Sequence, residues 1–191
     1  MKKLYHVSTT PNLKVLIPRA STHKIPYVYA SQYPEFCLLI GSKKSHGDFD
    51  GSYGLLNKTV YFQEAYPNAF KERFQGETCY LYEVDPTTFQ EGKTSFKGEV
   101  VSEEEVKVLS CEKIDDVYTR LLQEIKEGKL KLIEYSTDPD YQQTIRDRIK
   151  KKLIITDVIN HPEWPIYQFC KQKFGDIMDE IINTNMNNSH N

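Results

Sequence analysis

Leu4-Tyr5-His6-Val7-Ser8 is a short apolar stretch with a histidine at its centre, and Pro26-Tyr27-Val28-Tyr29-Ala30-Ser31 is a second such stretch that carries tyrosine. Each runs directly into Ser, Thr, Pro or Asn residues, which favour turns. A polar side chain in a buried strand costs free energy unless a partner satisfies it. Two such strands near one end of the chain therefore predict the wall of a small-molecule site.

The chain through about residue 110 has the pattern of short strands separated by turn residues. The content of Val, Tyr, Phe and Thr in these segments is typical of strands. A helix is expected at residues 35–40, because Pro34 suits a first helical turn and Gly41 follows the last apolar residue. The expected strands are residues 3–7, 27–30, 59–62, 78–84, 97–101 and 106–109.

Residues 41–54 are rich in glycine and are predicted to form a loop. Within it, Asp48-Phe49-Asp50-Gly51 resembles part of a calcium-binding loop. That pattern also requires three spaced oxygen ligands before the glycine and a glutamate at its twelfth position, where Thr59 stands. We therefore predict no metal site. A plain surface loop and a mobile loop that covers a ligand both remain open.

The last third of the chain has helical periodicity instead. Gly128 is suited to ending the first helix, and Asp138-Pro139 is a start signal for the second. Lys150-Lys151-Lys152 is interpreted as a solvated helix end, with contact to a phosphate-rich partner as the alternative. The apolar stripes are Ile114, Val117, Leu121, Leu122 and Ile125; Tyr141, Ile145, Ile149 and Leu153; and Ile166, Phe169, Cys170, Phe174, Ile177 and Ile181.

These patterns predict an α+β protein in three parts. Residues 1–112 form a core, residues 113–182 a helical C-terminal extension packed on that core, and residues 183–191 an Asn-rich, disordered tail. A chain of 191 residues is long enough to bury a core without disulfides or metals.

Composition excludes several classes of function. A net charge of −2 gives no strong field toward nucleic acid or anionic membrane. No apolar run approaches the roughly 20 residues that span a bilayer, and no long apolar region follows Met1-Lys2-Lys3 as a signal peptide requires. The four cysteines are widely spaced without a CxxC pair. They are expected to be buried, reduced thiols of a cytoplasmic protein.

Three polar residues in the strand-rich part are candidates for chemistry. His6 lies in the first strand, Tyr29 in the second, and Glu99 opens a late strand in Gly98-Glu99-Val100-Val101-Ser102. Taken singly, a histidine in a strand more often has a structural role than a catalytic one, and a tyrosine in a strand more often packs in the core than binds a ligand. Taken together, their order resembles the H-Y-E triad of the ADP-ribosyltransferase fold, which is shared by diphtheria-type toxins, poly(ADP-ribose) polymerases and DNA-targeting toxins.

The resemblance covers about residues 3–110 and departs from the family at two positions. Tyr5-His6-Val7-Ser8 has Val7 where the family has glycine, and Val100 replaces the usual aromatic residue after the glutamate. The family resemblance implies a split β-sandwich of two small sheets with flanking helices. It also implies that NAD is bound as a substrate.

The resemblance implies a role for each residue. Glu99 would hydrogen-bond the ribose 2′-hydroxyl, stabilise the oxocarbenium-like state and deprotonate a nucleophile. Tyr29 would stack on nicotinamide, and His6 would bond the adenosine-side ribose. The backbone of Val7 and the hydroxyl of Ser8 would hold the nicotinamide amide.

Other charged residues near these motifs have weaker assignments. Arg19 and His23 lie between the first two strands, where the family places the dinucleotide phosphates or adenosine, and a guanidinium there could pair with pyrophosphate. An ordinary surface loop is the alternative. Glu103-Glu104-Glu105 is predicted to be an exposed acidic turn, because three adjacent carboxylates cannot all face one pocket.

The expected activity is transfer of ADP-ribose from NAD to a macromolecular acceptor, protein or nucleic acid, with release of nicotinamide. One alternative is an NAD-dependent RNA 2′-phosphotransferase, which shares the fold and holds a phosphate with Arg and His. A second is a non-catalytic module that binds NAD or ADP-ribose. A third is a structural or interaction protein without a nucleotide site.

Overall fold

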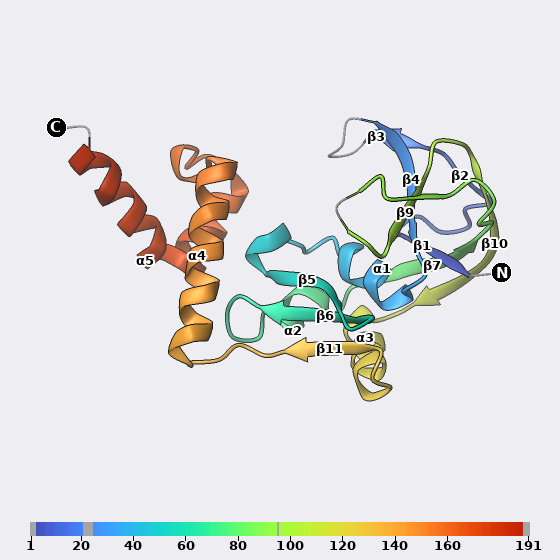
Figure 1. Cartoon of the computed structure of the whole chain (residues 1–191), viewed down its shortest axis with the longest axis horizontal. Helices are drawn as coiled ribbons and strands as arrows, with labels where there is room; N and C mark the ends of the chain where they lie inside the picture. The colour runs from blue at the N-terminus through green and yellow to red at the C-terminus, as the bar shows by residue number, and fades with distance from the viewer. Residues whose placement is uncertain (1–2, 21–24, 95, 189–191) are drawn as a thin grey trace. The chain divides into compact units, whose positions relative to one another are not determined.

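A computed structural model of the chain describes residues 3–20, 25–94 and 96–188. Within these residues the protein is α+β, with an eight-stranded sheet, a three-stranded sheet and five α-helices (Figure 1). The predicted α+β class is confirmed. The chain divides into two compact units: the first comprises residues 1–45, 53–62 and 70–133, and the second comprises residues 46–52, 63–69 and 134–191.

The larger sheet belongs to the first unit and has the strand order β2-β10-β7-β1-β4-β9-β8, with β3 paired to β4. The five strands predicted outside residues 59–62 all lie in it. Its central strands are antiparallel to their neighbours, and β1 lies between β7 and β4. The strands are Leu4–Ser8 (β1), Val15–Leu16 (β2), Arg19–Ala20 (β3), Pro26–Ser31 (β4), Cys79–Val84 (β7), Gln90–Glu91 (β8), Glu99–Ser102 (β9) and Val106–Ile114 (β10).

The smaller sheet has the order β11-β6-β5, formed by Leu130–Ile133, Thr59–Glu64 and Gly51–Leu56. Helices α1 (Pro34–Ile40), α2 (Ala69–Phe74) and α3 (Val117–Lys126) supply apolar side chains to the same core. Burying each such side chain contributes about 1.5–3 kcal/mol relative to leaving it exposed. The buried members include Phe36, Leu39, Val60, Phe62, Phe70, Phe74, Leu121 and Leu130.

Strand β5 begins at Gly51, so the prediction of a loop across the whole of residues 41–54 was wrong from that residue onward. Gly54 contributed to the misreading, because glycine usually weakens a strand. Here the glycine permits close packing: a Cβ at this position would lie 2.9 Å from the ring of Tyr61. Helix α2 and strand β11 were not predicted either, since each is too short to show a clear period.

The second unit contains two long helices, α4 (Pro139–Thr156) and α5 (Pro165–Asn188). Asp138 caps α4, and its carboxylate accepts from the backbone N–H groups of Asp140 and Tyr141. The predicted stripes on both helices are confirmed as a buried face. They pack with residues from the two short stretches 46–52 and 63–69, and the cluster includes Phe49, Ala65, Tyr66, Ile145, Ile149, Leu153, Cys170, Phe174 and Ile181.

The unit boundaries differ from those predicted at residues 112 and 182. The first unit continues through Ile133, because Leu121 of α3 and Leu130 of β11 belong to the same buried cluster as α1 and β6. Helix α5 continues through Asn188, into the Asn-rich segment that was predicted to be disordered. Asn is only a moderately poor helix former, so its presence alone does not end a helix.

All four cysteines are free, and Cys37, Cys79 and Cys170 are buried as predicted. Cys111 is exposed, because the middle of β10 faces solvent. Across the described part of the chain, no helix combines the length and apolar character needed to cross a bilayer.

Candidate functional site

The candidate site lies where β1 and β4 diverge. Among the described residues these strands are paired only at Tyr5 and Ser31, whereas β1 pairs with β7 along its whole length. The His6 ring bridges the gap beyond that pair, with Nδ1 2.8 Å from the carbonyl oxygen of Tyr29. A carbonyl can only accept, so Nδ1 carries the proton and Nε2 is left as an acceptor in neutral His6.

The position of His6 also determines its charge. Burial lowers the pKa of His6 below its ordinary value, and the hydrogen bond to the Tyr29 carbonyl opposes this shift only in part. His6 is therefore neutral at pH 7. A neutral imidazole with a fixed tautomer suits a site that must accept a hydrogen bond from a hydroxyl group.

Glu99 enters this region from β9. It begins the strand directly after Gly98 and pairs in register with Ser31 of β4. Directly opposed residues of antiparallel strands point to the same face, so Glu99 lies beside Ser31 on the face that also carries Tyr5 and Val7. The Glu99 side chain is half-buried.

His6, Tyr29 and Glu99 line one cavity of about 470 Å³, which we call the Glu99 cavity. The structure therefore brings together the three residues that the sequence analysis singled out, although 93 positions separate the first from the last. Among the described residues that line this cavity, Glu99 is the one carboxylate. The remaining lining residues are apolar or aromatic: Val7, Ala30, Phe36, Ile40, Gly41 and Tyr53.

Val7 is accommodated in this wall by Gly41. A Cβ on Gly41 would lie 2.6 and 2.8 Å from the two γ-carbons of Val7. Gly41 has φ −83°, so its backbone conformation does not require glycine. Glycine is needed here because a side chain would occupy the space of Val7. The absence of a side chain at Gly41 therefore gives the Val7 side chain room in this wall.

Phe36, Ile40 and Tyr53 were missed by the sequence analysis. Phe36 and Ile40 belong to α1, which was predicted, and the available signal was that this helix follows the Tyr29 strand directly. Tyr53 belongs to β5, which was read as loop. Its ring packs edge-on against Phe36, with centroids 6.0 Å apart, so both aromatic residues form one wall.

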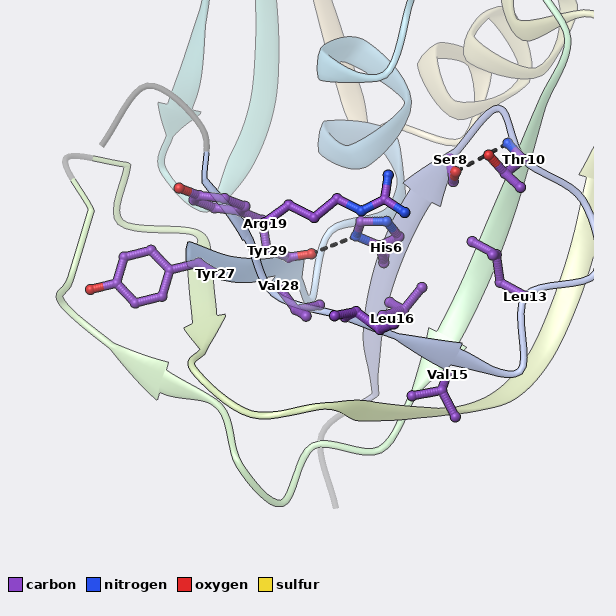
Figure 2. Close-up of a pocket in the computed structure, with 11 residues that line it drawn as sticks. His6, Ser8, Thr10, Leu13, Val15, Leu16, Arg19, Tyr27, Val28 and Tyr29 are labelled. Carbon is purple, nitrogen blue, oxygen red and sulfur yellow. Dashed lines mark hydrogen bonds between the residues drawn. The ribbon is translucent and has the colours of Figure 1, made fainter. Parts of the chain in front are cut away.

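His6 and Tyr29 also line a second cavity of about 300 Å³, which we call the Arg19 cavity (Figure 2). The segment from Thr10 to Leu13, which lines this cavity, is held by the buried side chain of Tyr82. The Tyr82 hydroxyl donates to the Thr10 carbonyl at 2.7 Å and accepts from the Leu13 N–H. The other lining residues are Ser8, Thr10, Leu13, Val15, Leu16, Ile17, Arg19, Tyr27 and Val28.

Arg19 provides the positive charge of this cavity. It lies on β3 in register with Tyr27, and its side chain extends over the cavity toward His6 (Figure 2). Ser8 lines the same cavity, and its hydroxyl accepts from the Thr10 N–H at 3.1 Å. Ser8 is absent from the lining of the Glu99 cavity, to which the preceding residue Val7 contributes.

The other residues considered in the sequence analysis do not line the Glu99 cavity or lie outside the described residues. Residues 103–105 are exposed and line neither cavity, which confirms the predicted acidic turn. Val100 is half-buried against an apolar cluster with Leu4, Val28 and Tyr82, and it does not line the Glu99 cavity. His23 lies outside the described residues. Within the described ranges, no three His, Cys, Asp or Glu side chains are grouped to hold a metal ion.

No known protein-family model, curated protein or solved structure matches this chain. The interpretation of the site therefore rests on its geometry. Two adjoining cavities share His6 and Tyr29, one contributing a carboxylate and the other a guanidinium. This arrangement suits an extended ligand with a cationic or polar reacting end and an anionic middle.

Proposed function

We propose that this chain is an NAD-dependent ADP-ribosyltransferase with an ADP-ribosyltransferase-like fold. The observation that carries the proposal is the meeting of His6, Tyr29 and Glu99 in one cavity. They lie on β1, β4 and β9, which are consecutive in the larger sheet although distant in sequence. The opening between β1 and β4 supports the split-sheet architecture that the triad resemblance implies.

The two cavities suit the two halves of NAD. The nicotinamide riboside half would occupy the Glu99 cavity, with its ring against Tyr29 and the aromatic wall of Phe36 and Tyr53. The adenosine half would occupy the Arg19 cavity. The guanidinium of Arg19 would pair with the pyrophosphate, which carries the negative charge of the dinucleotide.

The proposed reaction breaks the bond between nicotinamide nitrogen and ribose C1′. The electron pair of that bond neutralises the pyridinium ring, which leaves as nicotinamide, while positive charge develops on the ribose. Glu99 would stabilise this charge and accept a hydrogen bond from the 2′-hydroxyl. The acceptor then bonds to C1′, and its proton passes to the carboxylate.

His6 supports this chemistry as a neutral acceptor. Its Nδ1–H is committed to the Tyr29 carbonyl, so Nε2 is the atom that would receive a hydrogen bond from a ribose hydroxyl. Because the pKa of His6 is lowered, no proton competes for this atom at neutral pH.

The proposed function also implies a cell compartment and binding partners for this protein. We infer a cytoplasmic protein, because its four cysteines are free and three of them are buried. Its partners would be NAD and a macromolecular acceptor, protein or nucleic acid. No membrane partner is proposed.

The test is incubation of cell extract with labelled NAD and the chain, followed by separate protease and nuclease digestion. We expect label in a macromolecule with the unaltered chain and background label with Glu99→Gln. Glu103→Gln is the matched control, since that carboxylate is exposed and lines neither cavity. Equal labelling by Glu99→Gln, or absence of both labelling and nicotinamide release, would refute the assignment.

The presence of Arg19 and His6 in the lining of one cavity also favours a second candidate, the NAD-dependent RNA 2′-phosphotransferase. An arginine and a histidine that line the same polar-rimmed cavity can hold a phosphate. Incubating the chain with 2′-phosphorylated RNA and NAD separates the two activities. Loss of the 2′-phosphate without labelled acceptor supports this candidate, and an unchanged RNA contradicts it.

A non-catalytic NAD-binding module is a third candidate function. It is suggested by Val7 and Val100, which differ from the residues that the ADP-ribosyltransferase motifs have at these positions. Calorimetry with NAD combined with a nicotinamide assay distinguishes it. Binding without nicotinamide release, in the presence of extract, would identify a binder.

A further inference from the structure

Ser31 occupies the junction of the three strands that carry the candidate site. It lies on β4, faces Tyr5 of β1 and pairs with Glu99 of β9. The residue is fully buried, at 0% exposure. A buried hydroxyl must be hydrogen-bonded, because its desolvation is otherwise unfavourable.

The Ser31 hydroxyl is bonded on both sides. It donates to the carbonyl oxygen of Gly98 at 2.6 Å, and it accepts from the backbone N–H of Tyr33 at 3.1 Å. Gly98 immediately precedes Glu99, so the hydroxyl fixes the peptide plane from which the Glu99 side chain emerges. Removing it would leave the Gly98 carbonyl without this donor, and the restraint on that plane would be weakened to the hydrogen bond that the Glu99 N–H donates to the Phe96 carbonyl at 3.1 Å.

Packing restrains the same segment from the other side. Phe96 stacks on Phe36 with ring centroids 3.7 Å apart, and Phe36 also lines the Glu99 cavity. Gly98 has no space for a side chain, because a Cβ would lie 2.6 Å from the Phe96 ring and 3.3 Å from Leu55. The turn before Glu99 is therefore held by close packing as well as by the Ser31 hydroxyl.

We propose that Ser31 is a positioning residue that holds the Glu99 carboxylate in its catalytic orientation. This inference rests on the proposed function of the Glu99 cavity. Ser31 is absent from the lining of either cavity, so it acts through the Gly98–Glu99 backbone without touching the substrate. A displacement of about 1 Å in a reacting group can cost about 100-fold in rate, so loss of this restraint should reduce turnover.

Ser102 provides a matched control. It lies on β9, is also 0% exposed, and its hydroxyl bonds to Thr88 Oγ1 at 2.7 Å and to the backbone of Glu104. Ser31 and Ser102 thus share residue type and burial, and each hydroxyl bonds to two other residues. They differ in that Ser31 bonds to Gly98, which directly precedes Glu99, whereas the partners of Ser102 are Thr88 and Glu104.

The experiment measures nicotinamide release from NAD by Ser31→Ala and Ser102→Ala, with melting temperature determined for both. We expect kcat to fall about 10- to 100-fold in Ser31→Ala with KM within about twofold, and kcat to be retained in Ser102→Ala at a similar loss of thermal stability. Ser31→Thr, which keeps the hydroxyl, should restore much of kcat.

If Ser31→Ala does not fold, Ser31→Cys takes its place, because it retains the side-chain shape while weakening both hydrogen bonds. A kcat in the Ser31 variant that equals that of Ser102→Ala overturns the positioning role and leaves the proposed function intact. Absence of NAD binding and of nicotinamide release in the unaltered chain overturns both.

Discussion

The Glu99 cavity and the Arg19 cavity share His6 and Tyr29 but differ in their chemistry. The Glu99 cavity has an apolar and aromatic wall around one carboxylate, whereas the Arg19 cavity has a hydroxyl-bearing rim and an exposed guanidinium. A carboxylate in apolar surroundings suits stabilisation of a developing positive charge. An exposed guanidinium suits capture of an anion. Under the proposed function, turnover would depend on the first cavity and affinity on the second.

The strongest test of this division is Glu99→Gln. The amide keeps the size of the side chain and removes the charge, so nicotinamide release should fall about 10²- to 10³-fold while NAD binding changes little. Steady-state kinetics and calorimetry measure the two quantities. A parallel loss of binding would mean that Glu99 acts mainly in affinity.

Gly41→Ala tests how Val7 shapes the Glu99 cavity. The new methyl group would meet the γ-carbons of Val7, and such overpacking typically costs about 1–3 kcal/mol in the free energy of unfolding. Val7→Ala in the same chain should recover most of that loss, as chemical denaturation would show.

Gly175→Ala is the matched control for that substitution, because no heavy atom lies within 4 Å of the added Cβ. Its free energy of unfolding should not fall. Additive effects of Gly41→Ala and Val7→Ala would contradict the proposed compensation between them.

Arg19→Ala should have a smaller and different effect. We expect KM for NAD to rise about 10-fold with kcat nearly unchanged, because in the proposed binding mode the guanidinium would contact the pyrophosphate, which does not react. Lys14→Ala, an exposed cation on the preceding segment, is the control. The division fails if Arg19→Ala lowers kcat as severely as Glu99→Gln.

The pH dependence of His6 should be the smallest effect. Its folded-state pKa lies below the ordinary value of 6.5, so the unfolded chain binds more protons as the pH falls below neutral. The contribution of neutral His6 to stability is present above pH 6.5 and is lost as the pH falls through the folded-state pKa. The melting temperature of the unaltered chain should therefore fall more between pH 7 and pH 5 than that of the His6→Gln variant. An equal loss in both would contradict this.

The five longer strands of the larger sheet were predictable because they are rich in β-branched and aromatic residues and are flanked by turn signals, whereas the two-residue strands β2, β3 and β8 were not predicted. The same reasoning located His6, Tyr29 and Glu99, which are polar residues in otherwise apolar strands. Tyr53 was missed because the glycines around it indicate a loop, and only the neighbouring Tyr61 ring explains why Gly54 is required in a strand. Contacts between segments distant in sequence are not encoded in local periodicity.

The interleaved units have a consequence for how this protein can be divided. The helices after Ile133 complete a core that also contains Phe49 and Tyr66 from the middle of the chain. Truncation at that point would expose these aromatic residues, and the shortened chain should aggregate. The helical unit is therefore not a transferable module, because it must fold together with segments that precede it in the chain, from residue 46 onward.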